Sequence, residues 1–245
     1  MSEQILRVEG LSKWFGGLQA VKEVSFSMRR GEILGLIGPN GAGKTTAFNM
    51  IAGFLKPSAG SVHFDGRDMT GSKPWDVCKA GVARTFQLSK PFGDMTVIDN
   101  LMVGGFARHT DRSRNRERAL EVADFLGLGP LVETEAQNLT AFDRRRLELA
   151  RALCTEPELL LMDEVVAGAT PSEAEEMVKL VRKVRDRGVS ILIVEHVMKV
   201  IMSLSDRVIV FDHGELIAEG EPAAVVSKPE VLKAYFGENH DIPGA

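Results

Sequence analysis

Short runs of consecutive apolar residues recur along the chain, and segments of helical periodicity separate many of them. Runs of this kind are typical of strands that are buried on both faces of a parallel sheet. The predicted strands are Ile5–Val8, Val24–Met28, Ile33–Ile37, Ser61–Phe64, Val82–Thr85, Leu159–Met162, Ser190–Val194, Val208–Phe211 and Leu216–Ala218. Because strands and helices alternate, the pattern predicts an α/β fold with a largely parallel sheet covered by helices.

The helix predicted after Thr170 has the clearest boundaries. Thr170 and Glu173 form a T-x-x-E capping box, Pro171 occupies the first helical position, and Gly188 closes the far end. Residues 92–153 carry no strand signal. The helical patterns within them are Val97–Ala107, Arg114–Leu126 and Asp143–Leu153. We therefore expect a helical subdomain inserted into the sheet domain.

Residues 38–45 read Gly-Pro-Asn-Gly-Ala-Gly-Lys-Thr, the G-x-x-x-x-G-K-[ST] pattern of a phosphate-binding loop. In such a loop, backbone N–H groups surround the phosphates, Lys44 adds positive charge, and the Thr45 hydroxyl can hold Mg²⁺. An ordinary Gly-rich turn is the alternative. The apolar run Ile33–Ile37 before the loop and the helical pattern Thr45–Leu55 after it favour the phosphate site.

Two carboxylates, Asp163 and Glu164, follow the apolar run Leu159–Met162. In a phosphoryl-transfer site, an acid at a strand end can hold Mg²⁺ directly or through water. The next acid can take a proton from the attacking water. A strand that merely ends in a turn gives the same string, but the phosphate loop upstream favours the functional interpretation.

Gln87 and His196 each follow a predicted strand. A carboxamide at this position can reach a metal ion and water, and an imidazole can donate to a γ-phosphate. Each alone is compatible with a surface Gln or a satisfied His. Their order relative to residues 38–45 and 163–164 is what favours a role in the site.

Charge and cysteine content narrow the class of protein. The net charge of -4 argues against a general nucleic-acid binder, and the two cysteines give no disulfide framework, which indicates a reducing compartment. The start Met1–Gln4 lacks the pattern of a signal peptide, and no apolar stretch approaches the roughly 20 residues of a membrane span. We expect any membrane role to come through a partner.

The basic run Arg108–Arg118 is interpreted as a solvated loop and helix start, with a nucleic-acid or lipid-headgroup contact as the alternative.

Together these motifs resemble the ATP-binding subunit of an ABC transporter, and the resemblance covers essentially the whole chain. It implies a P-loop NTPase (RecA-like) core with a mainly parallel sheet, N-terminal antiparallel β strands and an inserted helical subdomain. The implied ATP-binding domain is 5–237, with core 5–91 and 154–237, helical subdomain 92–153, and a C-terminal tail at 238–245.

The resemblance also implies roles for individual residues. Phe15 matches the aromatic residue that stacks on adenine, with a core Phe as the alternative. The implied nucleotide-binding residues are Phe15, Gly38, Pro39, Asn40, Gly41, Ala42, Gly43, Lys44, Thr45 and Thr46. The metal would be held by Thr45 and Gln87, with Asp163 acting through water. Glu164 matches the general base and His196 the switch histidine, and residues 169–171 fall at the D-loop.

Within the superfamily, the chain is most similar to bacterial uptake systems for branched-chain and other hydrophobic amino acids. The phrases that carry this likeness are GGLQAV, GVARTFQ, VEHVMKVIMSLSDRVIVFDHGE and KPEVLKAYFGE. It implies ATP and Mg²⁺ as ligands, ATP hydrolysis coupled to transport of such amino acids or similar small carboxylates, and a place at the cytoplasmic side of the inner (plasma) membrane. The implied partners are a second ATPase subunit, permease subunits and, indirectly, a solute-binding protein, with no nucleic acid. A lipid-export ATPase, a soluble ABC ATPase and a non-hydrolysing ATP-gated subunit remain alternatives.

One motif departs from the family pattern of Leu-Ser-Gly-Gly-Gln. The corresponding residues are Leu139, Thr140, Ala141, Phe142, Asp143 and Arg144. Alignment on the Arg-Arg-Leu-Glu string at 145–148 places Thr140 on the Ser, Phe142 on a Gly and Arg144 on the Gln.

The effect of this change on ATP binding depends on whether Phe142 blocks one amide–phosphate contact. A hydrogen bond to a charged group contributes about 1.5–3 kcal/mol, so its loss would weaken ATP binding there by about one to two orders of magnitude. Thr140 as cap and Asp143 at the third position keep the features of a helix start. A divergent but working signature is favoured, and an impaired composite site is the alternative.

Overall fold

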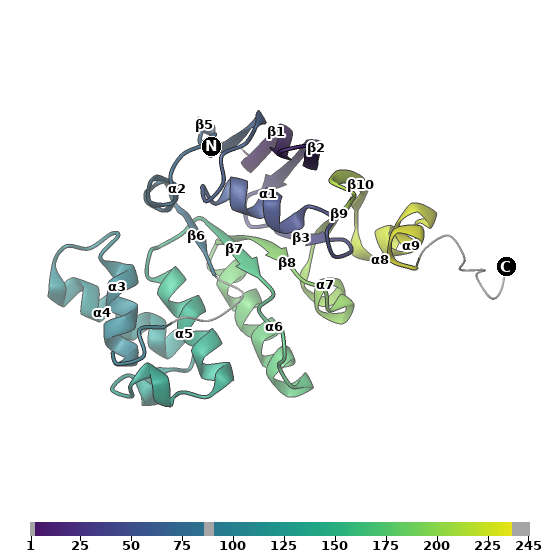
Figure 1. Cartoon of the computed structure of the whole chain (residues 1–245). Helices are drawn as coiled ribbons and strands as arrows, with labels where there is room; N and C mark the ends of the chain where they lie inside the picture. Colours follow the sequence, from purple (N-terminus) through teal and green to yellow (C-terminus); the bar gives the residue numbers. More distant parts are fainter. Residues whose placement is uncertain (1–2, 86–90, 237–245) are drawn as a thin grey trace. The chain divides into compact units, whose positions relative to one another are not determined.

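The computed structural model describes residues 3–85 and 91–236 and is drawn in Figure 1. The chain divides into two compact units, one made of residues 1–72 and 192–245 and the other of residues 73–191. The predicted helical subdomain falls within the second unit. The other predicted domain limits stay predictions, and the tail at 238–245 lies outside the described residues.

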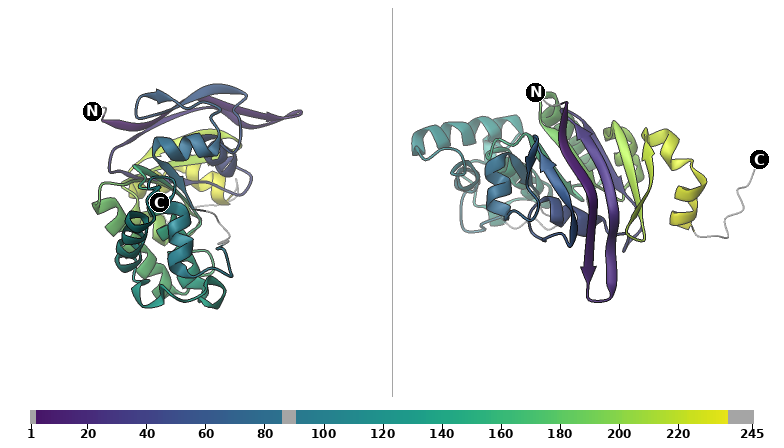
Figure 2. Two further views of the ribbon diagram at one scale, coloured as in Figure 1. Left: turned by 90° about the vertical axis from the view of Figure 1, so that its left-hand side faces the viewer. Right: turned by 90° about the horizontal axis from the view of Figure 1, so that it is seen from above.

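The first unit contains a four-stranded antiparallel sheet. Its strands are β1 (Gln4–Phe15), β2 (Leu18–Arg29), β4 (Ala59–Phe64) and β5 (Arg67–Asp68), in the order β2-β1-β4-β5. The implied N-terminal antiparallel strands are thus confirmed. Strand β1 continues well past the predicted Ile5–Val8 because a shift in register between Val8 and Leu11, at Gly10 with φ 55°, lets pairing with β2 resume. Figure 2 shows β1 and β2 as a long hairpin whose tip projects beyond the rest of this sheet.

The same unit contains the strand that leads into the phosphate loop. Strand β3 (Ile33–Ile37) is buried along its whole length and pairs in parallel with β9 (Arg207–Asp212). Strand β10 (Glu215–Gly220) pairs antiparallel with β9, and β8 (Ser190–Val194), of which residues 192–194 belong to this unit, lies next to β3. Burial on both faces explains why these strands read as continuous apolar runs.

Helices of the first unit follow the sequence prediction only in part. They are α1 (Lys44–Ile51), α7 (Met198–Leu204), α8 (Pro222–Val226) and α9 (Pro229–Phe236). The predicted helix Thr45–Leu55 stops earlier, at Ile51, because Gly53 adopts a left-handed φ of 78° that ends a helix. The sequence prediction missed α7, α8 and α9, which are short.

The second unit combines two parallel strands with the predicted helices. Strand β6 (Val82–Arg84) pairs with β7 (Leu159–Asp163). The helices are α2 (Pro74–Ala80), α3 (Val97–Gly105), α4 (Arg112–Phe125), α5 (Ala141–Leu153) and α6 (Pro171–Asp186), with 3₁₀ turns at Gly129–Leu131 and Ala136–Asn138. Helices α3, α4 and α5 contact one another, which confirms a helical region where strand signals were lacking. Helix α2 was missed.

Helix α6 begins as its sequence predicts. The Thr170 hydroxyl accepts a hydrogen bond from the Glu173 amide, and the Glu173 carboxylate accepts one from the Thr170 amide. Pro171 follows the cap, and Gly188 has a left-handed φ of 89° just past the end. The capping box is therefore confirmed in both of its hydrogen bonds.

The basic run Arg108–Arg118 is not solvated throughout, which corrects the sequence-based interpretation. The half-buried Arg108 donates from Nε to the Thr155 carbonyl at 2.7 Å and from Nη1 to the Lys79 carbonyl at 3.0 Å. These carbonyls lie at the ends of α5 and α2, where the helix supplies no internal donor. Arg108 thus ties two helix ends together.

Within the described ranges, no helix is long and apolar enough to cross a membrane.

Candidate functional site

The phosphate loop connects the buried strand β3 to α1 in the way the sequence predicts. Helix α1 begins at Lys44, and no side chain caps its start. The amides at a helix start have no acceptor inside the helix, so they are available to an anion. Thr45, the proposed metal ligand, is exposed at this start, and Thr46 follows half-buried.

Two glycines of the loop are required by close backbone approach. A side chain at Gly38, where φ is 148°, would place its Cβ 2.1 Å from the Phe211 carbonyl oxygen. At Gly43, with φ 97°, the Cβ would lie 2.5 Å from the Ala20 carbonyl oxygen. The glycines of the motif therefore let the loop pack against neighbouring backbone in its own unit.

The Lys44 side chain folds back over the loop. Its Nζ donates to the carbonyl oxygens of Gly38 at 2.7 Å and Pro39 at 2.8 Å. The Ala42 amide donates to the Pro39 carbonyl at 3.2 Å, which closes the turn. The ammonium group is thus held against the loop backbone, and it can exchange these carbonyl contacts for phosphate oxygens.

Phe15 is not a core residue. It ends β1 and is 48% exposed, and the Nζ of Lys13 lies 5.4 Å from the centroid of its ring. The exposed ring offers an apolar face on which a purine can stack, and the nearby ammonium group is favourable for a ligand that also carries phosphates. The core alternative is therefore excluded.

His196 follows the end of β8 and is exposed, while the preceding Glu195 is buried. Strand β8 lies next to β3, the strand that ends at the phosphate loop. The first unit thus carries Phe15, the whole phosphate loop and His196.

Asp163 in the second unit is the buried last residue of β7. The Nη2 of Arg84 lies 3.3 Å from its Oδ2, and both side chains are largely buried, at 12% and 8% exposure. The Asp163 amide donates to the Thr85 hydroxyl at 3.4 Å. Burial lowers the pKa of Arg84, and the Asp163 carboxylate opposes part of that shift.

Arg84 is a site residue that the sequence reasoning missed. It immediately precedes the Thr85-Phe86-Gln87 string, and that proximity to Gln87 was the signal available. Its pairing with Asp163 follows from the parallel register of β6 and β7, in which Arg84 lies opposite Leu161.

Glu164 has an unusual backbone conformation. Its φ is 49°, in the left-handed region that non-glycine residues seldom adopt, and its carbonyl accepts from the Ala167 amide at 3.2 Å. Residues held in this region cluster at functional sites, where the surrounding structure compensates for the strain. The turn directs the chain away from β7 immediately after Asp163.

The donors predicted for Mg²⁺ suit a hard cation. The Thr45 hydroxyl and the Asp163 carboxylate are oxygen ligands, which Mg²⁺ prefers, and Gln87 lies outside the described residues. Three or more His, Cys, Asp or Glu side chains do not gather into a metal cluster anywhere in the described ranges.

The divergent signature forms a regular helix start. Thr140 caps α5 by accepting from the Asp143 amide at 3.0 Å, and Asp143 also pairs with Arg146. Phe142 is 7% exposed, and the Arg146 guanidinium lies 5.1 Å from the centroid of its ring. The phenyl ring is therefore packed inward. Arg144 donates from Nε to the Leu139 carbonyl at 3.1 Å.

Arg145 links the signature helix to the segment that follows Glu164. Its Nη2 donates to the carbonyl oxygen of Ala167, just before the predicted D-loop at residues 169–171. In the sequence analysis, Arg145 served only to align the signature motif. Its contact couples the start of α5 to the turn after β7.

We expect Arg84→Gln to lower the free energy of unfolding by about 3 kcal/mol, because it removes the cation from a buried carboxylate. Urea denaturation of the purified chain measures this. The control is Arg185→Gln, which removes an exposed pair with Asp186 and should change stability by less than about 1 kcal/mol. Equal losses in the two variants would contradict a structural role for the buried pair.

Known proteins similar to this chain share its family and its fold. The ABC transporter family model matches residues 21–167. The chain is 40% identical to the high-affinity branched-chain amino acid transport ATP-binding protein LivG of Salmonella typhimurium, over 97% of the chain and 100% of LivG. It is 37% identical to the corresponding protein BraF of Pseudomonas aeruginosa, over 97% and 100%.

Solved structures give the same result. A nucleotide-free ATP-binding cassette from an ABC transporter superposes with a TM-score of 0.88 at 34% identity, covering 96% of this chain and 100% of that one. The ADP conformation of MJ1267, an ATP-binding cassette of an ABC transporter, superposes with a TM-score of 0.88 at 34% identity, covering 97% and 100%.

Proposed function

The chain belongs to the ABC transporter family, and we propose that it is the ATP-hydrolysing subunit of a bacterial importer of branched-chain or related hydrophobic amino acids. The similarity to LivG over nearly the full length of both proteins is the observation that carries this proposal. Similar small carboxylates are included in the proposed class of cargo. Lipid export and a soluble role have no comparable support.

The proposed nucleotide site uses the loop at 38–45. Its amides and the α1 start bind the phosphates, Lys44 adds charge, and Phe15 stacks on adenine. Thr45, Gln87 and, through water, Asp163 would hold Mg²⁺, which neutralises charge on the phosphate oxygens when bound. Arg84 fixes the orientation of the Asp163 carboxylate before nucleotide arrives.

In the proposed hydrolysis, Glu164 accepts a proton from the attacking water. In this assignment Asp163 serves the metal and Glu164, the next residue along the chain, serves the water. His196 would donate to the γ-phosphate, and Gln87 would orient metal and water.

The proposed partners are a second ATPase subunit, permease subunits and, indirectly, a solute-binding protein. We expect the permease to dock near Gln87 and residues 92–101, which would place the chain peripherally at the cytoplasmic side of the inner membrane. Exposed apolar side chains at Phe92, Val103 and Phe106 suit such a contact.

Uptake assays test this function. The chain, co-expressed with its permease subunits and solute-binding protein, should drive ATP-dependent accumulation of leucine, isoleucine or valine in proteoliposomes. ATP hydrolysis that rises on addition of the loaded binding protein is the expected companion result. Hydrolysis without uptake of any hydrophobic amino acid would contradict the proposed cargo.

We propose that the divergent signature works. The ring of Phe142 packs inward, and the Thr140 cap preserves the helix start, so the amides of the first turn remain in a helical arrangement. The alternative is an impaired composite site. In that case the nucleotide site built from this chain's signature and the partner's phosphate loop would hydrolyse ATP slowly.

Replacing Phe142 separates these two possibilities. We expect Phe142→Ala to lower the free energy of unfolding by about 3–5 kcal/mol, because it empties a packed position. ATP turnover per folded complex should change by less than about threefold. Phe142→Leu, which retains most of the packing, controls for misfolding. A tenfold or greater rise in turnover in either variant would show that the ring obstructs the site.

A further inference from the structure

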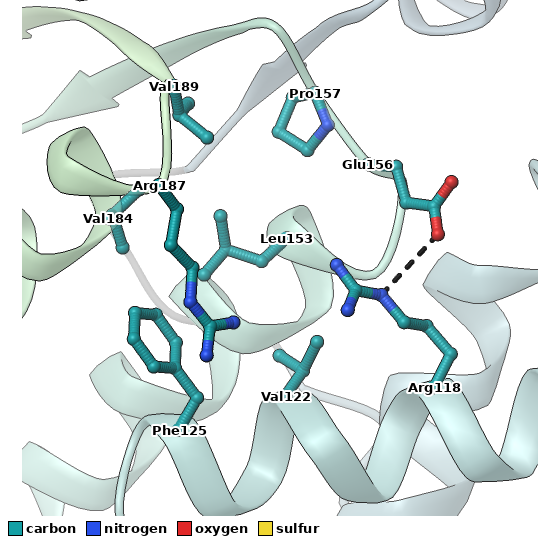
Figure 3. A pocket seen from close by; sticks show the side chains of 9 residues that line it. All are labelled: Arg118, Val122, Phe125, Leu153, Glu156, Pro157, Val184, Arg187 and Val189. Carbon is teal, nitrogen blue, oxygen red and sulfur yellow. Dashed lines mark ion pairs between the residues drawn. The ribbon is translucent and has the colours of Figure 1, made fainter.

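A pocket of about 400 Å³ opens in the second unit, and none of the residues that line it is assigned to the nucleotide site. Figure 3 shows its lining. Six of its nine lining residues are apolar, among them Val122 and Phe125 of α4, Leu153 of α5 and Val184 of α6. This volume is within the range of small-molecule sites, which bury an apolar ligand and fix it with few polar groups.

The pocket is lined by two arginines and one glutamate. Arg118 and Arg187 point from opposite sides toward its middle, and Glu156 is the one carboxylate among its nine lining residues (Figure 3). The Nε of Arg118 lies 3.4 Å from Oε1 of Glu156, and the Nε2 of His109 lies 3.0 Å from the same oxygen. Glu156 therefore already interacts with Arg118 and His109.

Arg187 has no carboxylate partner within the part of the chain that the structure describes. Its guanidinium lies 3.4 Å from the centroid of the Phe125 ring, stacked at the pocket wall. Stacking holds the planar group in one orientation while leaving its N–H edge available. A fixed guanidinium edge beside an apolar surface favours a ligand with a carboxylate, which it can bind through two parallel hydrogen bonds.

We propose that this pocket binds a small branched aliphatic carboxylate. The carboxylate binds the edge of Arg187, and the branched tail packs on Val122, Leu153 and Val184. Arg118 lines the pocket but is already paired with Glu121 at 2.9 Å and Glu156 at 3.4 Å, so Arg187 is the anchor. A phosphate-bearing ligand fits less well, because a strongly hydrated anion gains nothing from apolar walls. The inference rests on the proposed function in one respect: the proposed cargo and its deaminated products belong to this chemical class.

Calorimetric titration of the full-length chain without nucleotide tests the pocket. The probe is 4-methylpentanoate, and a dissociation constant of about 1 mM or lower is expected for a ligand of about eight heavy atoms. L-Leucine is titrated in the same way, so that binding of the proposed cargo can be compared with binding of the acid that lacks the amino group. The alcohol 4-methylpentan-1-ol, which has the tail without the carboxylate, should bind at least tenfold more weakly.

Arg187→Gln should weaken 4-methylpentanoate binding at least tenfold, and Arg187→Lys should retain part of the affinity. Arg182→Gln, on α6 shortly before Arg187 but outside the pocket lining, is the matched control and should leave binding unchanged. Affinity should fall as ionic strength rises, because the guanidinium is exposed.

Absence of binding overturns the proposal, as does binding that Arg187→Gln leaves unaltered, or equal binding of acid and alcohol. None of these results bears on ATP hydrolysis, because Arg187 lies outside the proposed nucleotide site. Failure of the pocket and failure of the proposed function are therefore separate outcomes. Binding of leucine in preference to the acid would identify the cargo itself as the occupant.

Discussion

Glu164→Gln is expected to reduce ATP hydrolysis by about 10²–10⁴-fold while ATP binding is retained. A general base contributes about this much to a rate, and the amide that replaces the carboxylate cannot accept the proton from water. Side-chain length and the hydrogen-bonding oxygen are preserved, so the phosphate loop, in the other unit, keeps its contacts. Phosphate release by the transporter complex measures the loss, and binding of a fluorescent ATP analogue measures what remains.

The control is Glu133→Gln, which changes an exposed carboxylate on the same unit. It should leave turnover within about twofold of the unmodified chain. Unchanged turnover in Glu164→Gln would remove this residue from the role of base. Loss of ATP binding together with hydrolysis would instead point to a structural role for the left-handed turn at this position.

Lys44→Ala is expected to weaken ATP binding by about one to two orders of magnitude and to reduce hydrolysis at least as much. A hydrogen bond between charged groups is worth about 1.5–3 kcal/mol, and no other side chain is predicted to supply that charge at the loop. The substitution also releases the carbonyl oxygens of Gly38 and Pro39, which Lys44 holds at 2.7 and 2.8 Å. Equilibrium titration with ATP measures the change in affinity.

Lys22→Ala is the matched control, since Lys22 pairs with Glu215 at the surface of the same unit. It should leave ATP affinity unaltered. In a complex of two different ATPase subunits, removal of the partner's equivalent lysine gives a second comparison. Similar losses from both lysines agree with a working signature in this chain, whereas a smaller loss from the partner's lysine supports the impaired composite site.

Local sequence was sufficient wherever the deciding interactions lie within a few residues. The apolar run Ile33–Ile37 becomes a strand because each of its side chains is buried, and the Thr170 capping box forms because its partners are three residues apart. The phosphate loop was recognisable for the same reason, since its glycines, lysine and threonine are contiguous. Short elements such as α2 and α7 were missed because seven residues carry too little periodicity to identify a helix.

The position of Phe142 shows where sequence patterns stop being informative. The aligned motif allows the ring to face outward or inward, with opposite consequences for a nucleotide. Packing decides this choice, since the ring is 7% exposed and lies under the Arg146 guanidinium. Phe15 is the converse case, because the sequence allowed a core position and the structure leaves the ring exposed at the end of β1.

The sequence by itself determined most of the strands, the phosphate loop, the capped start of α6 and the order of the candidate site residues, because each depends on neighbours along the chain. Only the tertiary structure decided that Arg84 pairs with Asp163, 79 residues away, and that Arg108 holds two helix ends. It also decided that Arg118 and Arg187 face one pocket. The physical reason is that electrostatic interactions and hydrogen bonds depend on separation in space and not on separation along the sequence. The packing of whole helices and strands decides which distant residues come together.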